Sequence, residues 1–284
     1  MGSVGDVTAD PYTSTMIATA IYSSYGPADD GRIKPDVVGN GENLYSSNAV
    51  SNASYEFSSG TSMAAPNVTG TVALIAEHYE NTFGALPAAA TSKGLVIHTA
   101  SDAGNVGPDY AYGWGLVDAG DAATFITSAA AGVGGDTLIE GDFTGTELTY
   151  KFVSTTGASV KATIVWTDAP GAAQAAGLDI RNPLLVSDLD LTITDESGTA
   201  YYPWTLDPNN PTAPAIRTTR NQVDNVEQVA IDRPALGVYT VHVSTSGAIT
   251  AQPFTLLVSG LEAIGGGGVK PTPPERVLPA VGPP

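Results

Sequence analysis

The sequence of 284 residues contains no cysteine, and it is poor in basic residues, with 11 lysines and arginines against 29 aspartates and glutamates. The absence of cysteine excludes disulfides and thiol catalysis, so a bound metal is the alternative way to reinforce a protein that works outside the cell. The net charge of −18 repels phosphate backbones, which argues against nucleic acid as a partner. The acidity suits a secreted protein that holds cations, although a solvated acidic surface explains it equally well. The apolar runs are too short for a membrane span.

One serine stands between a flexible glycine and a run of small residues, in the order Gly-Thr-Ser-Met-Ala-Ala-Pro at positions 60–66. A serine hydroxyl becomes a good nucleophile only where a base takes its proton and fixed donors receive the charge on the substrate carbonyl. Residues 62–79 are mostly small or apolar, which predicts a helix buried on all sides. The free amides and dipole of that helix would face the oxyanion beside Ser62, and Pro66 fits its first turn. We therefore predict Ser62 as the nucleophile.

This motif resembles the nucleophile motif of subtilisin-like serine peptidases, which reads Gly-Thr-Ser-Met-Ala-x-Pro. Residues 22–27 and 31–38 resemble the segment that leads to the nucleophile in that family, and residues 107–119 resemble the segment that closes the catalytic domain. The resemblance implies hydrolysis of protein or peptide substrates through an acyl-enzyme on Ser62, whose backbone N–H also serves as an oxyanion donor. It is carried at the motif by Gly60, Thr61, Ser62, Met63 and Pro66.

A base and its orienting carboxylate are missing from the expected places. Subtilisin-like enzymes carry them in the order Asp, His, Ser, yet His78, His98 and His242 all follow Ser62. His78 falls on the predicted helix about 24 Å from Ser62, at about 1.5 Å per residue. We therefore expect a missing N-terminal segment to supply the Asp, the His and an oxyanion asparagine, and expect this chain to be inactive alone. The alternative is a non-catalytic binding or structural module that retains a peptidase-like segment.

The chain divides into three predicted parts. Residues 1–130 are predicted as the C-terminal part of an α/β catalytic domain with a mostly parallel sheet, with extended segments at 4–7, 19–22 and 33–38 and helices at 62–79, 88–99 and 118–127. Residues 131–262 show short alternating strands separated by turn residues, among them 161–166, 239–243 and 254–258, which indicates an all-β jelly-roll-like sandwich. Residues 263–284 are rich in glycine and proline and are predicted as a linker or tail, for instance to a surface anchor.

The strand predicted at residues 186–193 carries a candidate metal site. With a period of two, Leu189, Leu191 and Ile193 face the core while Asp188 and Asp190 share the opposite face. Adjacent carboxylates repel unless a cation lies between them, and calcium accepts six to eight oxygen ligands. Residues 131–262 also resemble the β-barrel domain that follows the catalytic domain in certain alkaline subtilisin-like peptidases, and more distantly the P domain of proprotein convertases. The resemblance is carried by residues 166–168, 188–191 and 225–227, and it implies a calcium-bearing, stabilising domain. Solvated acidic turns are the alternative. The candidate ligands are Asp168, Asp188, Asp190, Asp224, Asn225 and Glu227.

Overall fold

Residues 1–131 form three helices beside a short parallel sheet in the computed structural model, which describes residues 1–264 apart from 10, 176 and 179. Strands β1 (Gly2–Val4) and β2 (Val38–Asn40) pair in parallel. A 3-10 turn, η1, spans Ser14–Met16. The helices are α1 (Thr61–Phe83), α2 (Ala89–His98) and α3 (Ala119–Ala131), and an antiparallel hairpin of β3 (Leu44–Ser47) and β4 (Tyr55–Ser58) precedes α1.

Helix α1 is buried along one face only, so the prediction of a helix buried on all sides is wrong. Its buried residues are Ala64, Val68, Ile75 and Tyr79, at the spacing of a single helical stripe. Leu74 on another face is 65% exposed. Composition misled the prediction, because alanine and glycine are compatible with either environment. The helix ends at Gly84, whose φ of 84° is in the left-handed region that glycine favours.

The strands predicted in the first part are shorter than expected. Residues 4–7 and 19–22 were expected as strands, but β1 ends at Val4, and Thr19 forms only an isolated bridge to it. The extended run predicted at 33–38 enters a strand only at Val38. Loop contacts satisfy the remaining backbone groups there, as where the Gly5 N–H donates to the Ala18 carbonyl at 3.1 Å.

The second part is one antiparallel sheet that bends until it nearly closes. The strands follow the order β11-β5-β10-β6-β9, and β7 pairs with both β10 and β8. Strand β10 pairs with β7 through its first half and with β6 through its second, while β5 accompanies both halves. The jelly-roll prediction is not confirmed. The strands are β5 (Thr137–Ser154), β6 (Val160–Trp166), β7 (Asp190–Asp195), β8 (Ala200–Tyr201), β9 (Val226–Ile231), β10 (Gly237–Ser259) and β11 (Glu262–Ala263).

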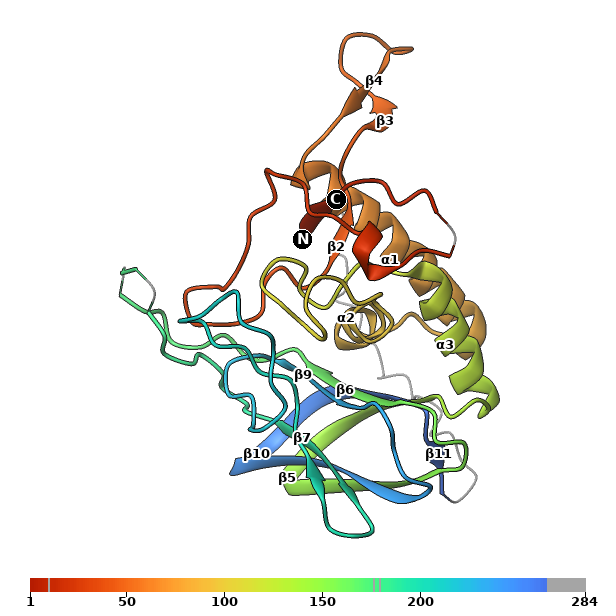
Figure 1. Cartoon of the computed structure of the whole chain (residues 1–284), viewed down its shortest axis with the longest axis vertical. Helices are drawn as coiled ribbons and strands as arrows, with labels where there is room; N and C mark the ends of the chain where they lie inside the picture. Colours follow the sequence, from red (N-terminus) through yellow and green to blue (C-terminus); the bar gives the residue numbers. More distant parts are fainter. Residues whose placement is uncertain (10, 176, 179, 265–284) are drawn as a thin grey trace, which may run out of the picture.

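Helix α2 lies against the outer face of this sheet, α3 contacts its edge at β5, and α1 packs on α2 and α3 on the side away from the sheet (Figure 1). Leu95 and Ile97 of α2 belong to the same buried cluster as Val165 of β6 and Leu257 of β10. A second cluster fills the inside of the bent sheet and includes Trp166. The predicted tail lies outside the described residues from 265 onward. No helix in the described part of the chain is long and apolar enough to cross a membrane.

Candidate functional site

The turn before Ser62 is held by the small parallel sheet. The Gly60 N–H donates to the Gly41 carbonyl at 2.8 Å, and the Gly41 N–H donates to the Val4 carbonyl of β1 at 3.1 Å. The Tyr22 hydroxyl donates to the same Gly41 carbonyl at 2.9 Å. Gly60 is the N-cap of α1, so Ser62 lies in the first helical turn, and its side chain is exposed. The motif residues thus lie on a hydrogen-bonded turn that leaves Ser62 exposed.

A general base does not reach Ser62 within the described residues. The Ser62 hydroxyl has no hydrogen-bond partner there, and the three histidines of the chain bond other side chains. His78 bonds Thr127, His98 bonds Thr163 and Ser259, and His242 bonds Glu147 and Thr194. The described chain therefore presents a nucleophile motif without the partner that would activate it.

Three of the predicted metal ligands gather where β7 approaches β9. The Leu191 N–H of β7 donates to Glu227 Oε2 of β9 at 2.6 Å. One oxygen of each of Asp188, Asp190 and Glu227 is buried without a hydrogen-bond partner. Arg220 Nη1 lies 2.9 Å from the other oxygen of Asp190, a partner that the sequence did not indicate. Three orphan carboxylate oxygens in one region are an unusual concentration of unsatisfied negative charge.

The pKa values reflect this concentration. Burial raises the pKa of Asp190 to about 6, although Arg220 acts in the opposite direction. Burial also raises the pKa of Glu227 well above its usual range, partly opposed by the Leu191 N–H and reinforced by the charges of Asp190 and Asp188. The negative charges of the three carboxylates therefore repel one another, and ionising all three requires a compensating positive charge.

The other three predicted ligands have structural partners. Asp168 accepts the N–H groups of Val186 and Ser187 at 2.7 and 2.9 Å. Asp224 accepts the Ile33 N–H at 2.9 Å. Asn225 Nδ2 donates to the Trp166 carbonyl at 2.7 Å. Across the described residues, no three acidic or histidine side chains are already arranged around a common metal position.

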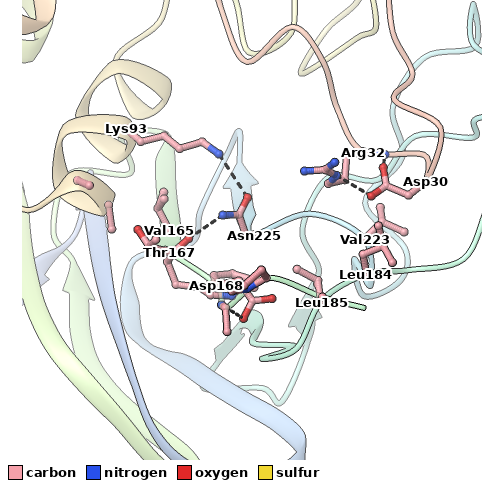
Figure 2. A pocket seen from close by; sticks show the side chains of 16 residues that line it. Asp30, Arg32, Lys93, Val165, Thr167, Asp168, Leu184, Leu185, Val223 and Asn225 are labelled. Carbon is pink, nitrogen blue, oxygen red and sulfur yellow. Dashed lines mark hydrogen bonds and ion pairs between the residues drawn. The ribbon is translucent and has the colours of Figure 1, made fainter. Parts of the chain in front are cut away.

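A cavity of about 430 Å³ lies between α2 and the sheet. Figure 2 shows Lys93 of α2 directed toward Asn225, and their Nζ and Oδ1 atoms are 3.3 Å apart. Arg32 on the other side is held by Asp30 at 2.7 Å. The charged side chains that line the cavity already have partners: Arg32 pairs with Asp30, Lys93 pairs with Asp36, and Asp168 accepts backbone N–H groups. None of the residues that line the cavity belongs to the nucleophile motif. No local pattern in the sequence indicates this cavity, because its walls come from segments that are far apart along the chain.

Comparison with known proteins finds a family-model match in the first part of the chain. Residues 3–115 match the model of the subtilase family of peptidases. This segment is related to the subtilases. The match confirms the resemblance predicted from the motif around Ser62, and we call residues 3–115 the subtilase segment.

Three curated relatives match this chain over part of its length. Pyrolysin of Pyrococcus furiosus is 49% identical over 61 residues, which cover 22% of this chain and 4% of pyrolysin. The C5a peptidase of Streptococcus pyogenes is 44% identical over 62 residues, which cover 22% of this chain and 5% of the C5a peptidase. Serine protease/ABC transporter B family protein tagA of Dictyostelium discoideum is 24% identical over 275 residues, covering 84% and 15%. The chain thus spans a small fraction of each relative, and the tagA alignment extends beyond the subtilase segment.

Two solved structures match parts of this chain with low similarity. Bacillus licheniformis lipase BlEst2 in propeptide form matches with a TM-score of 0.26 and 12% identity over 46% of this chain and 23% of that chain. The periplasmic lysozyme inhibitor PliG of Aeromonas hydrophila matches with a TM-score of 0.24 and 19% identity over 44% and 86%. Both scores are too low to support an argument.

Proposed function

We propose that this chain carries the nucleophile of a secreted subtilisin-like serine endopeptidase that hydrolyses protein or peptide substrates. The observation that carries the proposal is the exposed position of Ser62 in the first turn of α1, within a segment related to subtilases. Attack of Ser62 Oγ on the substrate carbonyl would place the developing oxyanion near the free amides of the helix N-terminus. Collapse of the oxyanion would break the peptide C–N bond and release the amine, which takes up the proton removed from Ser62, and water would then hydrolyse the acyl-enzyme.

The proton of Ser62 needs a base from elsewhere. Within the described residues every histidine is engaged by other side chains. We propose that a further segment, outside these 284 residues, supplies the Asp and the His, and that this chain alone does not hydrolyse peptides. The lack of a base also supports the second candidate function, a non-catalytic binding or structural module.

A fluorophosphonate probe that labels activated serines tests both candidates. The chain alone is expected to remain unlabelled, and mixing it with a subtilase segment that carries the Asp and His motifs is expected to give labelling that Ser62→Ala abolishes and Ser92→Ala, on helix α2, leaves intact. Ser62-dependent labelling of the chain alone would overturn the claim that its base comes from elsewhere. Absence of labelling in a mixture shown to form a complex would favour the non-catalytic module.

We also propose that Asp188, Asp190 and Glu227 bind a calcium ion that stabilises the bent sheet. The support is the set of three buried carboxylate oxygens without partners, which are the hard ligands that calcium prefers. A bound cation would supply positive charge at this place, and the three side chains would hold β7 against β9 around it.

Calorimetric titration with CaCl₂ and thermal unfolding at pH 8 test this site. Calcium at about 100 times its dissociation constant is expected to stabilise the protein by about 2.7 kcal/mol. Glu227→Gln is expected to lose the binding heat and the calcium-dependent rise in Tm, while Glu77→Gln on the surface of α1 keeps both. Equal calcium responses of the two variants, or no response in the unsubstituted protein, would refute the proposal.

A further inference from the structure

The β3–β4 hairpin projects from the body of the molecule and carries three exposed aromatic side chains (orange, top of Figure 1). Tyr45, Tyr55 and Phe57 are 64%, 57% and 69% exposed. They contact one another, since the ring centroids of Tyr45 lie 5.5 Å from Tyr55 and 4.9 Å from Phe57. Within the described residues, none of the three belongs to a buried cluster.

The hairpin has two chemically different faces. Tyr45 is paired with Phe57, and Ser47 is paired with Tyr55. Because side chains alternate along a strand, the three aromatic rings share one face, while Ser46 and Glu56 lie on the other. The rings therefore form a continuous aromatic platform, which we define as Tyr45, Tyr55 and Phe57.

This platform is attached closely to the nucleophile. Phe57 precedes Ser62 by only five residues, so the chain limits their separation to about 18 Å. Hydrogen bonds also fasten the base of the hairpin, because the Asn43 N–H donates to Ser59 Oγ at 2.9 Å and the Gly60 N–H donates to the Gly41 carbonyl at 2.8 Å. The platform and Ser62 are thus held on one short, hydrogen-bonded unit.

We propose that the aromatic platform binds an apolar or aromatic side chain of the peptide substrate, within about five residues of the bond that Ser62 attacks. An extended peptide advances by about 3.3 Å per residue, so about five residues cover the distance that the chain allows between Ser62 and the rings. Aromatic rings bury a large area with few rotatable bonds, which suits a rigid recognition surface. The inference rests on the proposed peptidase function and assigns substrate preference to the hairpin.

Fluorescence anisotropy with the full chain tests this assignment. The probes are fluorescein-labelled ten-residue peptides rich in Ser and Gly, each with one Phe at a different position, and a matched peptide in which Ser replaces that Phe. At the best position the Phe peptide is expected to bind about tenfold more tightly than the Ser peptide, as expected for burial of one aromatic side chain. The double variant Tyr45→Ser, Phe57→Ser is expected to lose this preference. Leu74→Ser, which removes an exposed apolar side chain from α1, is expected to keep it.

Two further measurements separate the possible failures. Ser62→Ala is expected to leave the preference for the Phe peptide unchanged, because the rings bind the side chain without the Ser62 hydroxyl. A failure of Ser62 to react in the labelling experiment would therefore leave the peptide-binding result valid. A benzophenone in place of the Phe is expected to crosslink to peptides containing residues 44–58. Equal binding of Phe and Ser peptides, or an unchanged preference in a double variant that remains folded by circular dichroism, would overturn the inference. So would self-association of the chain that the double variant abolishes, since the platform would then cover a second copy.

Discussion

His98 shows how a single buried residue joins the helices to the sheet. The Ser259 hydroxyl donates to the Asp136 carboxyl. Ser259 Oγ, which lies 2.9 Å from His98 Nε2, therefore accepts the imidazole N–H. His98 Nδ1 is then unprotonated and accepts from the Thr163 hydroxyl 2.8 Å away, and Gln228 Nε2 donates to that hydroxyl oxygen at 3.0 Å. This chain of hydrogen bonds is satisfied by a neutral imidazole, in one tautomer.

Acid is expected to weaken the fold through His98. Burial, with repulsion from Lys161, lowers the pKa of His98 well below its usual 6.5. The unfolded chain takes up a proton near pH 6.5 and the folded chain does not, so this contribution to stability is complete above that pH and declines as the pH falls, by up to about 1.4 kcal/mol per pH unit. Urea unfolding between pH 5 and 7.5 measures it.

The contribution of His98 is measured by the difference in unfolding free energy between a variant and the unsubstituted protein at each pH. Asp190, whose pKa is raised to about 6, makes the unfolding free energy change with pH in the opposite direction over the same range, and this effect cancels in the difference. His98→Gln is expected to lack the acid-dependent decline relative to the unsubstituted protein, whereas His78→Gln is expected to retain it. Parallel pH profiles for all three proteins would contradict this account.

Sequence patterns located individual residues where the determining contacts are local. The alternation through Leu189, Leu191 and Ile193 predicted their burial, and all three are fully buried. Local sequence patterns could not predict the environment of His98, because its partners Thr163 and Ser259 lie 65 and 161 residues away in the sequence. Local periodicity carries no information about such contacts.

At the scale of elements, helix α2 depends on the absence of a side chain at Gly94. A Cβ at this position would lie 2.7 Å from Leu257 Cδ1 and 3.4 Å from Val165 Cγ2, both in buried side chains of the sheet. Helix and sheet therefore approach more closely here than alanine would allow. A Cβ at Gly70, on the exposed side of α1, would have no neighbour within 4 Å.

Replacing each glycine by alanine is expected to have opposite effects. Gly70→Ala is expected to stabilise the protein by about 0.5–1 kcal/mol, since alanine is the better helix former. Gly94→Ala gains the same propensity but overpacks the contact with Leu257, which costs about 1–3 kcal/mol. In urea unfolding, Gly94→Ala should therefore have a clearly lower midpoint than Gly70→Ala. Equal midpoints would show that the packing between α2 and β10 relaxes freely.

Elements were predictable where their pattern is continuous. The three helices were expected at 62–79, 88–99 and 118–127, and the structure has them at 61–83, 89–98 and 119–131. Residues 239–243 and 254–258 were expected as separate strands, yet both belong to β10. The intervening residues resemble a turn in sequence, and pairing with β5 on both sides of them makes the strand continuous.

At the scale of the whole molecule, the helices of residues 1–131 and the bent sheet share one buried cluster. Leu95 of α2 and Phe125 of α3 pack with Val226 of β9 and Leu257 of β10 in the same cluster. Lys161 Nζ also donates to the His98 carbonyl at 3.0 Å, across the boundary. The sheet is thus a structural support for the helices that follow Ser62, which neither part of the sequence predicts alone.

Asp224 should couple the two parts. It is 6% exposed, and its carboxylate accepts the Ile33 N–H of the subtilase segment at 2.9 Å and Asn221 Nδ2 at 3.0 Å. Asp224→Ala removes the acceptor of the Ile33 N–H and leaves Asn221 Nδ2 with only the Trp204 carbonyl at 3.5 Å, so we expect a loss of about 1–3 kcal/mol in unfolding free energy. Asp232→Ala, at a side chain that is 72% exposed and paired with Arg217, is expected to change it by less than about 1 kcal/mol.

Hydrogen exchange locates this loss. Asp224→Ala is expected to speed exchange of the Ile33 amide more than that of the strand amides of β5 and β10, because only the Ile33 amide loses its acceptor directly. Asp224→Asn keeps an acceptor oxygen and is expected to restore most of the protection. If Ile33 exchanges equally in Asp224→Ala and the unsubstituted protein, its amide does not depend on Asp224. Contact between the two parts would then rest on the shared apolar cluster and on the hydrogen bonds of His98 and Lys161, without a contribution from Asp224.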